Sequence, residues 1–319
     1  AGIETDKASP EWIQACNQVD KIIVVSEHAK CSLNTSYPFE DKKTGETGIV
    51  RLETPIEVIG YPVKEREVVD IGLDLSTEFN FLAIAQISPR KDVGTLVKNF
   101  IEEFHDNNDV GLLLKFHTGN HSVIDDEMTT KKISSWCEKY PDRKCQVYLV
   151  HGNLSEDELH SLYKIPSVKS YITTTHGEGY GLPIFEAAYS GLPVVAPAWS
   201  GQNDFLYAPV KNPTSGRVKK APLFTKIKYD LKPVEEAAIW DGVINRGTKW
   251  AYVDVEAYKK SLRNTYEALG SKKSMAKQLQ EYLKVEFSEE KIYQKYVDAI
   301  LEMDSTSEEI EELFSQLEI

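Results

Sequence analysis

The sequence predicts an α/β protein built on doubly wound parallel sheets. Short, continuous apolar runs alternate along the chain with segments of helical character. Such runs are typical of parallel strands that helices cover on both faces. The expected strands are 21–25, 56–60, 79–87, 111–116, 146–150, 168–174 and 193–196. The expected helices begin at Pro10, Ser26, Val93, Ser155 and Leu182, one further helix ends at Lys139, and the chain is helical after Glu256.

The elements divide into three parts. Tyr61-Pro62 is a natural hinge, because the residue before a proline is restricted to extended geometry. Residues 1–62 hold too few elements for a doubly wound domain, so we expect them to be the closing part of a truncated one. Residues 63–286 hold a complete series. Residues 287–319 are expected to form a last helix and, from Asp304, an acidic amphipathic tail that docks by one face.

Charge and composition exclude several classes of protein. The 37 basic and 50 acidic residues give a net charge of −13, so nucleic acid is not an expected partner. There is no apolar run of about 18 residues and no secretory signal, so we expect a cytoplasmic protein. Peripheral membrane association is not evident from the sequence. The four cysteines are scattered, without a C-x-x-C pair or histidines at metal-ligand spacing, so we expect reduced thiols and no metal site.

The most informative segment is the glycine-rich turn between residues 171 and 197. It reads YITTTHGEGYGLPIFEAAYSGLPVVAP, which combines a strand, a turn, a helix and the next strand. The glycines allow a tight turn and the close approach of a ligand. Pro183 suits the first turn of a helix, whose free amides and partial positive charge favour an anion.

Two glutamates flank this turn. Glu178 is expected in the loop and Glu186 in the opening turn of the helix, both facing one crevice beyond the strand ends. A carboxylate is a two-oxygen acceptor that suits adjacent sugar hydroxyls. The pattern therefore indicates a ligand that carries both an anionic group and a sugar.

The two glutamates have seven residues between them in the frame HGEGYGLPIFEAAYSGLPVVAP. This segment resembles the donor-site signature of family 4 of the retaining glycosyltransferases, which have the GT-B fold. The segment AQISPRKD, residues 85–92, resembles the donor-phosphate loop of that family. The resemblance extends from about Pro10 to Met303. It implies a truncated acceptor-side domain, a Rossmann-like donor domain and a crossover helix. The implied reaction transfers a sugar from a nucleotide diphosphate to the hydroxyl of a glycan or other acceptor, with retention and without cofactor or required metal.

The resemblance also implies roles for single residues. Glu178 would contact the donor sugar, Glu186 the ribose and Lys91 the diphosphate. Cations are needed there because charge grows on the leaving group. The arginine that the family has five residues before the lysine is Gln86 here, so Arg90 is expected to supply the second positive charge. The other expected donor-binding residues are His176, Gly177, Gly179, Tyr180, Gly181, Leu182 and, near the base, Asn153 and Leu154.

Several positions allow two interpretations. His176 either contacts the donor or caps the strand end as a structural residue. Lys115 and His117 either touch the donor or face solvent. Ser200-Gly201-Gln202 either closes the pocket or forms a plain turn. The stretch Lys211–Lys232, with seven basic residues and one acidic residue, is either a solvated hairpin or a positive lip over a phosphorylated ligand.

Three other functions fit parts of the pattern. A nicotinamide-dependent oxidoreductase is disfavoured, because Leu182 replaces the third glycine of the dinucleotide fingerprint and Glu178 would repel a pyrophosphate. A GT-B epimerase or phosphorylase would differ mainly in the first domain. A non-catalytic module that binds a nucleotide sugar would bind a donor without turning it over.

Overall fold

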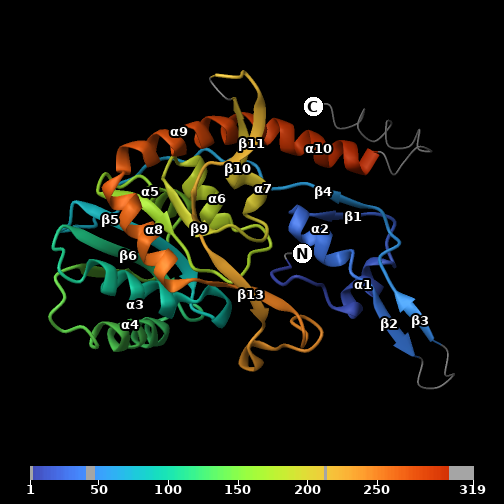
Figure 1. Ribbon diagram of the computed structural model, residues 1–319, viewed down its shortest axis with the longest axis horizontal. Coiled ribbons are helices and arrows are strands. Elements are labelled where there is room, and N and C mark those ends of the chain that lie inside the picture. Colours follow the sequence, from blue (N-terminus) through green and yellow to red (C-terminus); the bar gives the residue numbers. More distant parts are fainter. Residues whose placement is uncertain (1–2, 41–46, 212–213, 302–319) are drawn as a thin grey trace.

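A six-stranded parallel sheet forms the centre of the larger of two bodies (Figure 1). The computed structural model describes residues 3–40, 47–211 and 214–301. The sheet order is β12-β9-β8-β5-β6-β7, and every pair of neighbouring strands is parallel. The strands are β5 (Phe79–Gln86), β6 (Val110–His117), β7 (Gln146–Val150), β8 (Val168–Ile172), β9 (Val194–Pro197) and β12 (Thr225–Ile227). The predicted α/β fold class is confirmed.

Helices cover both faces of this sheet, so its strands are apolar on both sides. In β5, Phe81 packs into one buried cluster with Phe100, and its neighbour Leu82 packs into the other with Phe185. Each buried side chain of this size contributes about 2 kcal/mol relative to exposure. The helices of this body are α3 (Val93–Phe104), α4 (Val123–Cys137), α5 (Glu156–Leu162), α6 (Leu182–Tyr189), α7 (Asn203–Leu206), α8 (Val255–Glu267) and α9 (Leu269–Glu286). Ser155 and Glu158 form a capping box at the start of α5.

The order of the strands creates a crevice at the carboxyl end of β5. From β5 the chain moves outward to β6 and β7, and then returns to β8 on the other side of β5. At such a switch point the two connections leave in opposite directions and open a space beyond the strand ends. The short 3-10 helix η1 (Pro89–Lys91) follows β5, and the glycine-rich turn follows β8, so both border this space.

The smaller body is formed by residues 3–58. Its strands β1 (Ile22–Val24) and β4 (Ile56–Val58) pair in parallel, and β2 (Tyr37–Glu40) and β3 (Thr47–Val50) form a hairpin. Helices α1 (Pro10–Cys16) and α2 (Glu27–Leu33) pack on the strands around Ile13 and Val24. Ser9 and Ser26 cap the two helices with their hydroxyls.

The chain passes between the two bodies twice. Val63 donates its backbone N–H to the carbonyl of Phe287 across 2.7 Å, so the outgoing and returning segments lie side by side. Helix α10 (Glu289–Leu301) then packs on Ile59 and Ile23 of the smaller body. Figure 1 shows α9 and α10 running along one side of both bodies. The acidic tail expected from Asp304 lies outside the described residues.

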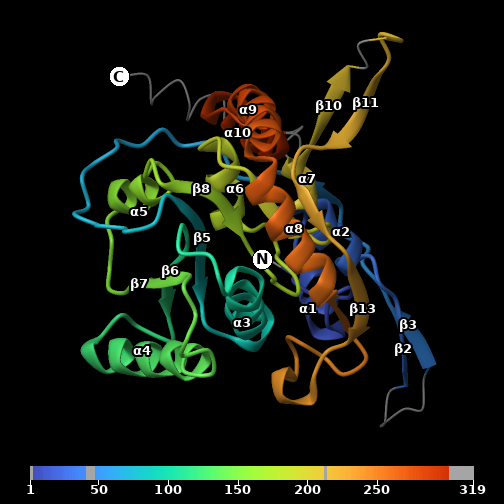
Figure 2. The ribbon, with the colours of Figure 1, turned by 60° about the vertical axis from the view of Figure 1, so that its left-hand side comes forward.

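The basic stretch contains more structure than the sequence analysis expected. Strands β10 (Tyr207–Lys211) and β11 (Val218–Pro222) form the expected hairpin, which projects past α9 (Figure 2). The next strand, β12, was missed because it has only three residues with a lysine in the middle, yet it extends the main sheet. Strands β13 (Tyr229–Pro233) and β14 (Lys249–Val253) form a second hairpin, with the 3-10 helix η2 (Glu236–Ala238) in its connection.

None of the four cysteines is in a disulfide. Within residues 3–301, apart from the two gaps, no helix is long and apolar enough to cross a membrane.

Candidate functional site

Glu178 and the two cations of η1 form the centre of the site. Lys91 donates to Oε1 of Glu178 across 2.5 Å, and Arg90 donates to Oε2 across 3.0 Å. Glu178 is only 7% exposed. Burial alone would raise the pKa of this carboxyl, but the charges of Lys91 and Arg90 outweigh burial and lower it. Glu178 is therefore an anion at neutral pH.

Arg90 is held mainly by the glycine-rich turn. Its Nη1 atom also donates to the carbonyl of Gly177 across 2.7 Å, and its Nη2 atom lies 3.7 Å from Oε1 of Glu4. Burial raises the pKa of Glu4, although the charge of Arg90 opposes this effect. The sequence analysis did not identify Glu4, because only the folded chain brings the start of the smaller body to this turn.

The glycine-rich turn has no space for larger residues at two places. A Cβ atom on Gly177 would lie 2.1 Å from the carbonyl oxygen of Glu4 and 2.7 Å from the ring of Trp199. Gly181 has a φ of +96°, in the left-handed region that favours glycine, and it is the N-cap of α6. These two glycines therefore fix the entry to α6.

The segment Ser200-Gly201-Gln202 supports the same turn through hydrogen bonds. The hydroxyl of Ser200 accepts the backbone N–H of Glu178 across 2.9 Å, and Gly201 donates its N–H to the carbonyl of Glu178 across 2.9 Å. Gln202 is fully buried and accepts from Ser200. The segment thus supports the backbone of Glu178 and lines neither of the two pockets beside α6.

Two adjoining pockets flank the start of α6. The first, which we call the lysine pocket, has a volume of about 300 Å³ and includes Pro183 in its wall. The second, which we call the glutamate pocket, has a volume of about 310 Å³ and includes Leu182 in its wall. The lysine pocket is lined by Ile84, Ala85, Gln86, Lys91, Lys115, His117, His121, Gly152, Asn153, Leu154, Leu159 and Pro183. The glutamate pocket is lined by Tyr61, Pro62, Lys64, Arg66, Glu156, Leu159, His160, Leu182, Phe185, Glu186 and Tyr189.

Six of the expected residues line these pockets. Gln86, Lys91, Asn153 and Leu154 line the lysine pocket, whereas Leu182 and Glu186 line the glutamate pocket. Glu178 lines neither pocket, because it is buried against Lys91. The two glutamates were expected to face one crevice, and in this structure only Glu186 lies in a pocket wall. Arg90 lines neither pocket.

Glu186 has its own buried partner. Tyr163 donates its hydroxyl to Oε2 of Glu186 across 2.8 Å. Burial raises the pKa of Glu186, and the hydrogen bond from Tyr163 and the charge of Arg66 reduce this rise. The free oxygen of Glu186 remains an acceptor on the wall of the glutamate pocket.

His176 and Tyr180 serve the packing of the turn. The Nδ1 atom of His176 lies 2.8 Å from the carbonyl of Ala251, and its ring contacts that of Tyr252 at a tilt of 38°, with centroids 4.2 Å apart. Its backbone N–H donates to the backbone carbonyl of Arg90. These contacts favour the structural interpretation of His176. Tyr180 is 4% exposed, and its ring packs against Phe205.

Lys115 lies where the sequence analysis placed it, at the end of a strand on the ligand side. Its Nζ atom donates to the carbonyl of Gly152 across 2.7 Å, and it lines the lysine pocket. Burial lowers the pKa of this ammonium group. In contrast, the described residues of the basic stretch Lys211–Lys232 line neither pocket.

The start of α2 joins the smaller body to the site. Ser26 donates its hydroxyl to the carbonyl of Gly179 across 2.6 Å, and the backbone N–H of Glu27 donates to Oδ2 of Asp204 across 2.7 Å. Burial raises the pKa of Asp204 to about 6, although the bond from Glu27 and the charge of Lys220 lower it. The sequence carries no local signal for these contacts, because each joins residues more than 150 positions apart.

Comparisons with known proteins agree with this geometry. No protein-family profile matches the chain. A probable sucrose-phosphate synthase 4 from Oryza sativa subsp. japonica is 31% identical over 132 residues, which are 39% of this chain and 12% of that protein. A sucrose-phosphate synthase from Thermosynechococcus elongatus superposes on 93% of this chain and 61% of its own, with a TM-score of 0.62 and 16% identity.

Two further solved structures contain bound nucleotide. HepE from Anabaena, in complex with UDP and glucose, superposes with a TM-score of 0.58 and 13% identity, covering 92% of this chain and 68% of its own. The pneumococcal O-GlcNAc transferase GtfA, in complex with UDP and GlcNAc, superposes with a TM-score of 0.55 and 16% identity, covering 95% of this chain and 52% of its own. The chain has the GT-B fold.

The GT-B fold accounts for the two bodies and for the place of the site between them. The six-stranded sheet is the centre of its Rossmann-like larger body. The chain spans less than two thirds of the length of both sucrose-phosphate synthases that it matches. At these identities the solved structures show the shared GT-B fold, and the activity has to be argued from the residues.

Proposed function

We propose that this chain is the donor-binding part, with an adjoining acceptor-side body, of a retaining glycosyltransferase of family 4. It transfers a sugar from a nucleotide diphosphate to an acceptor hydroxyl, and the reaction needs no metal. The observation that carries the proposal is the pairing of Lys91 with Glu178 at the carboxyl ends of β5 and β8, beside a pocket of about 300 Å³.

The pair supplies the two interactions that such a transfer needs. A diphosphate in the lysine pocket is an acceptor for Lys91, which stabilises the charge that grows as the bond between the anomeric carbon and the diphosphate breaks. Glu178 then accepts hydrogen bonds from donor-sugar hydroxyls. The acceptor oxygen bonds to the anomeric carbon while the bond from that carbon to the diphosphate breaks. The proton of the acceptor hydroxyl passes to the leaving diphosphate oxygen, and the nucleoside diphosphate departs.

A second cation is available in the same pocket. Lys115 lines the lysine pocket together with Lys91, whereas Arg90 is bound to Gly177 and Glu178 and lines neither pocket. We therefore assign Lys115 to the diphosphate and Arg90 to the orientation of Glu178. Asn153 and Leu154 line the same pocket and follow Gly152, which accepts from Lys115, and we assign them to the base. Glu186 lines the adjoining glutamate pocket, and we assign it to the ribose.

Calorimetry with nucleoside diphosphates tests the proposal. UDP is the first probe, because GtfA and HepE are in complex with UDP; GDP and ADP follow. Replacing Lys91 with alanine is expected to weaken binding about 10- to 100-fold, as expected for the loss of a charged hydrogen bond. Lys132→Ala, an exposed position on α4, is the matched control and should leave binding unchanged.

Activity is measured with the matching nucleotide sugars and simple acceptor glycans in the presence of a chelator. Transfer under these conditions, with the anomeric configuration of the donor kept in the product, is the expected result. Tight donor binding without turnover would instead favour a non-catalytic module. Failure to bind any nucleoside diphosphate would refute the proposed function.

A further inference from the structure

The end of β6, the loop that follows it and the first turn of α4 carry two histidines and an aspartate at regular spacing. His117, His121 and Asp125 follow one another at intervals of three intervening residues in the segment HTGNHSVID. The sequence analysis found no histidine at metal-ligand spacing, and it was wrong here. H-x₃-H is a spacing that zinc ligands use. It was missed because only histidines near the cysteines were considered as metal ligands.

The fold brings these three side chains together. The nitrogen atoms of His117 and His121 and a carboxylate oxygen of Asp125 all lie within 4.8 Å of one another. The two imidazole rings are 4.0 Å apart between centroids. His121 has a φ of +60°, an uncommon value for a residue other than glycine. The loop is thus bent so that both rings reach the same point.

Each imidazole has a nitrogen free for a ligand. The Nδ1 atom of His117 lies 3.2 Å from the carbonyl of Gly119, so the tautomer that donates there leaves a lone pair on Nε2. The Nδ1 atom of His121 is buried and has no hydrogen-bond partner among the described residues. A buried polar atom without a partner costs free energy of folding. A bound ligand would give this nitrogen the partner that the described protein atoms do not supply.

Asp125 is held rigidly by the surrounding backbone. Its carboxylate accepts the N–H groups of Thr118, Gly119 and His121 at 2.8 to 3.0 Å. His151 completes the set with its Nε2 atom 3.0 Å from Oδ2. Hydrogen bonds of this kind orient ligating carboxylates in metal sites and fix their geometry.

We propose that His117, His121 and Asp125 bind a divalent transition-metal cation of the zinc type, with His151 as the residue that positions Asp125. Two imidazoles and one carboxylate suit Zn²⁺ or Co²⁺ and are a poor match for Mg²⁺ or Ca²⁺, which prefer oxygen ligands. His117 and His121 also line the lysine pocket, so the bound cation borders the place of the proposed donor. Lys115 in that pocket is turned to the carbonyl of Gly152.

The test uses the full chain after treatment with a chelator, in the absence of nucleotide. Titration with Zn²⁺ is expected to show one bound ion per chain. Co²⁺ is expected to give the visible absorption of a four- or five-coordinate site without thiolate charge transfer, which excludes binding by the exposed Cys31. His117→Gln and His121→Asn should each weaken Zn²⁺ binding at least about 100-fold, and His151→Gln about 10-fold.

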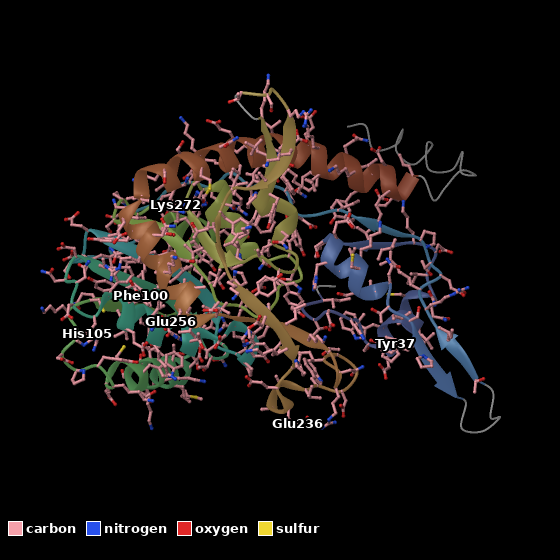
Figure 3. The ribbon with its side chains drawn as sticks, viewed as in Figure 1. Tyr37, Phe100, His105, Glu236, Glu256 and Lys272 are labelled. Atoms are coloured by element: carbon pink, nitrogen blue, oxygen red, sulfur yellow. The ribbon has the colours of Figure 1, made fainter. Side chains whose placement is uncertain are left out.

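The variants are chosen to keep the fold. Asparagine tolerates the left-handed backbone at position 121, and circular dichroism confirms that each variant is folded. His105→Asn is the matched control, because His105 lies 3.3 Å from Asp142 and 3.4 Å from Asp106 at the outer edge of the larger body (Figure 3). It represents adventitious binding by a surface histidine and aspartates.

The possible results distinguish a metal site at these residues from adventitious binding. Loss of binding in His117→Gln and His121→Asn, with none in His105→Asn, supports the site. No binding by the native chain, or equal affinity in folded His121→Asn, overturns it. The proposed sugar transfer is measured with chelator present and does not depend on this result.

Discussion

Lys91 and Glu178 are 87 positions apart in the chain, and the Nζ and Oε1 atoms of their side chains are 2.5 Å apart. The cation and the anion that the proposed transfer requires are thus paired with each other before a donor arrives. A diphosphate that accepts the hydrogen bond from Lys91 leaves Oε1 of Glu178 free to accept a hydrogen bond from a sugar hydroxyl. In the proposed transfer, binding of the diphosphate and recognition of the sugar are coupled through this ion pair.

Replacing Glu178 tests this coupling. Glu178→Gln should lower transfer at least about 1,000-fold, because the variant loses the charge that faces the reacting sugar. For Glu178→Ala the structure also predicts a loss of about 3 kcal/mol in unfolding free energy, since the alanine leaves two cations without their buried partner. Urea denaturation measures this loss. Native-like transfer by Glu178→Gln would remove Glu178 from the reaction.

Glu186 is expected to recognise the ribose. The native chain should bind a ribonucleoside diphosphate about 10-fold more tightly than its 2′- or 3′-deoxy analogue, because one charge-assisted hydrogen bond is lost. In Glu186→Ala this difference should disappear, as shown by calorimetry with both ligands.

The control for that experiment is Tyr163→Phe. It removes the hydroxyl that donates to Oε2 of Glu186 and keeps the carboxylate in the wall of the glutamate pocket. Discrimination between the ribose and deoxyribose ligands should therefore survive. If Glu186→Ala still discriminates, the glutamate pocket does not hold the ribose.

The sequence predicted the local elements of the site better than their contacts. Strand β5 and the entry to α6 are encoded by short-range signals, namely an apolar run and a glycine-rich turn followed by Pro183. Because parallel strands end at one edge, these signals also place Lys91 near Glu178. Glu4 carries no such signal, since its role arises only where the two bodies pack. Tyr163 carries none either, since it reaches Glu186 from the end of a different helix. The division into two pockets depends on side-chain volumes around α6.

The raised pKa of Asp204 predicts that the free energy of unfolding depends on pH. Its pKa is raised from 3.8 to about 6, so the folded chain holds this proton where the unfolded chain has released it. The group's contribution to stability is intact below about pH 3.8 and is lost as the pH rises to about 6. The shift corresponds to about 3 kcal/mol.

Asp204→Asn isolates this effect. The asparagine oxygen can still accept the N–H of Glu27, but the side chain does not ionise. Unfolding free energies at pH 4 and pH 7 should therefore show the native chain losing about 2.4 kcal/mol relative to the variant. The exposed Asp230→Asn is the control and should follow the native chain. Parallel pH profiles of native chain and Asp204→Asn would contradict the assignment.

Gly177 packs against Glu4 of the smaller body. An alanine at this position should disrupt the contact between Glu4 and the glycine-rich turn. Its Cβ atom would lie 2.1 Å from the carbonyl oxygen of Glu4, which is backbone and cannot rotate away. The expected cost is at least about 2 kcal/mol of unfolding free energy, together with a loss of transfer, because Glu178 is the next residue. Gly270→Ala in α9 meets nothing within 4 Å and should be neutral or stabilising by up to about 1 kcal/mol. A Gly177→Ala variant as stable and active as Gly270→Ala would show that the contact between Glu4 and the turn is not maintained in solution.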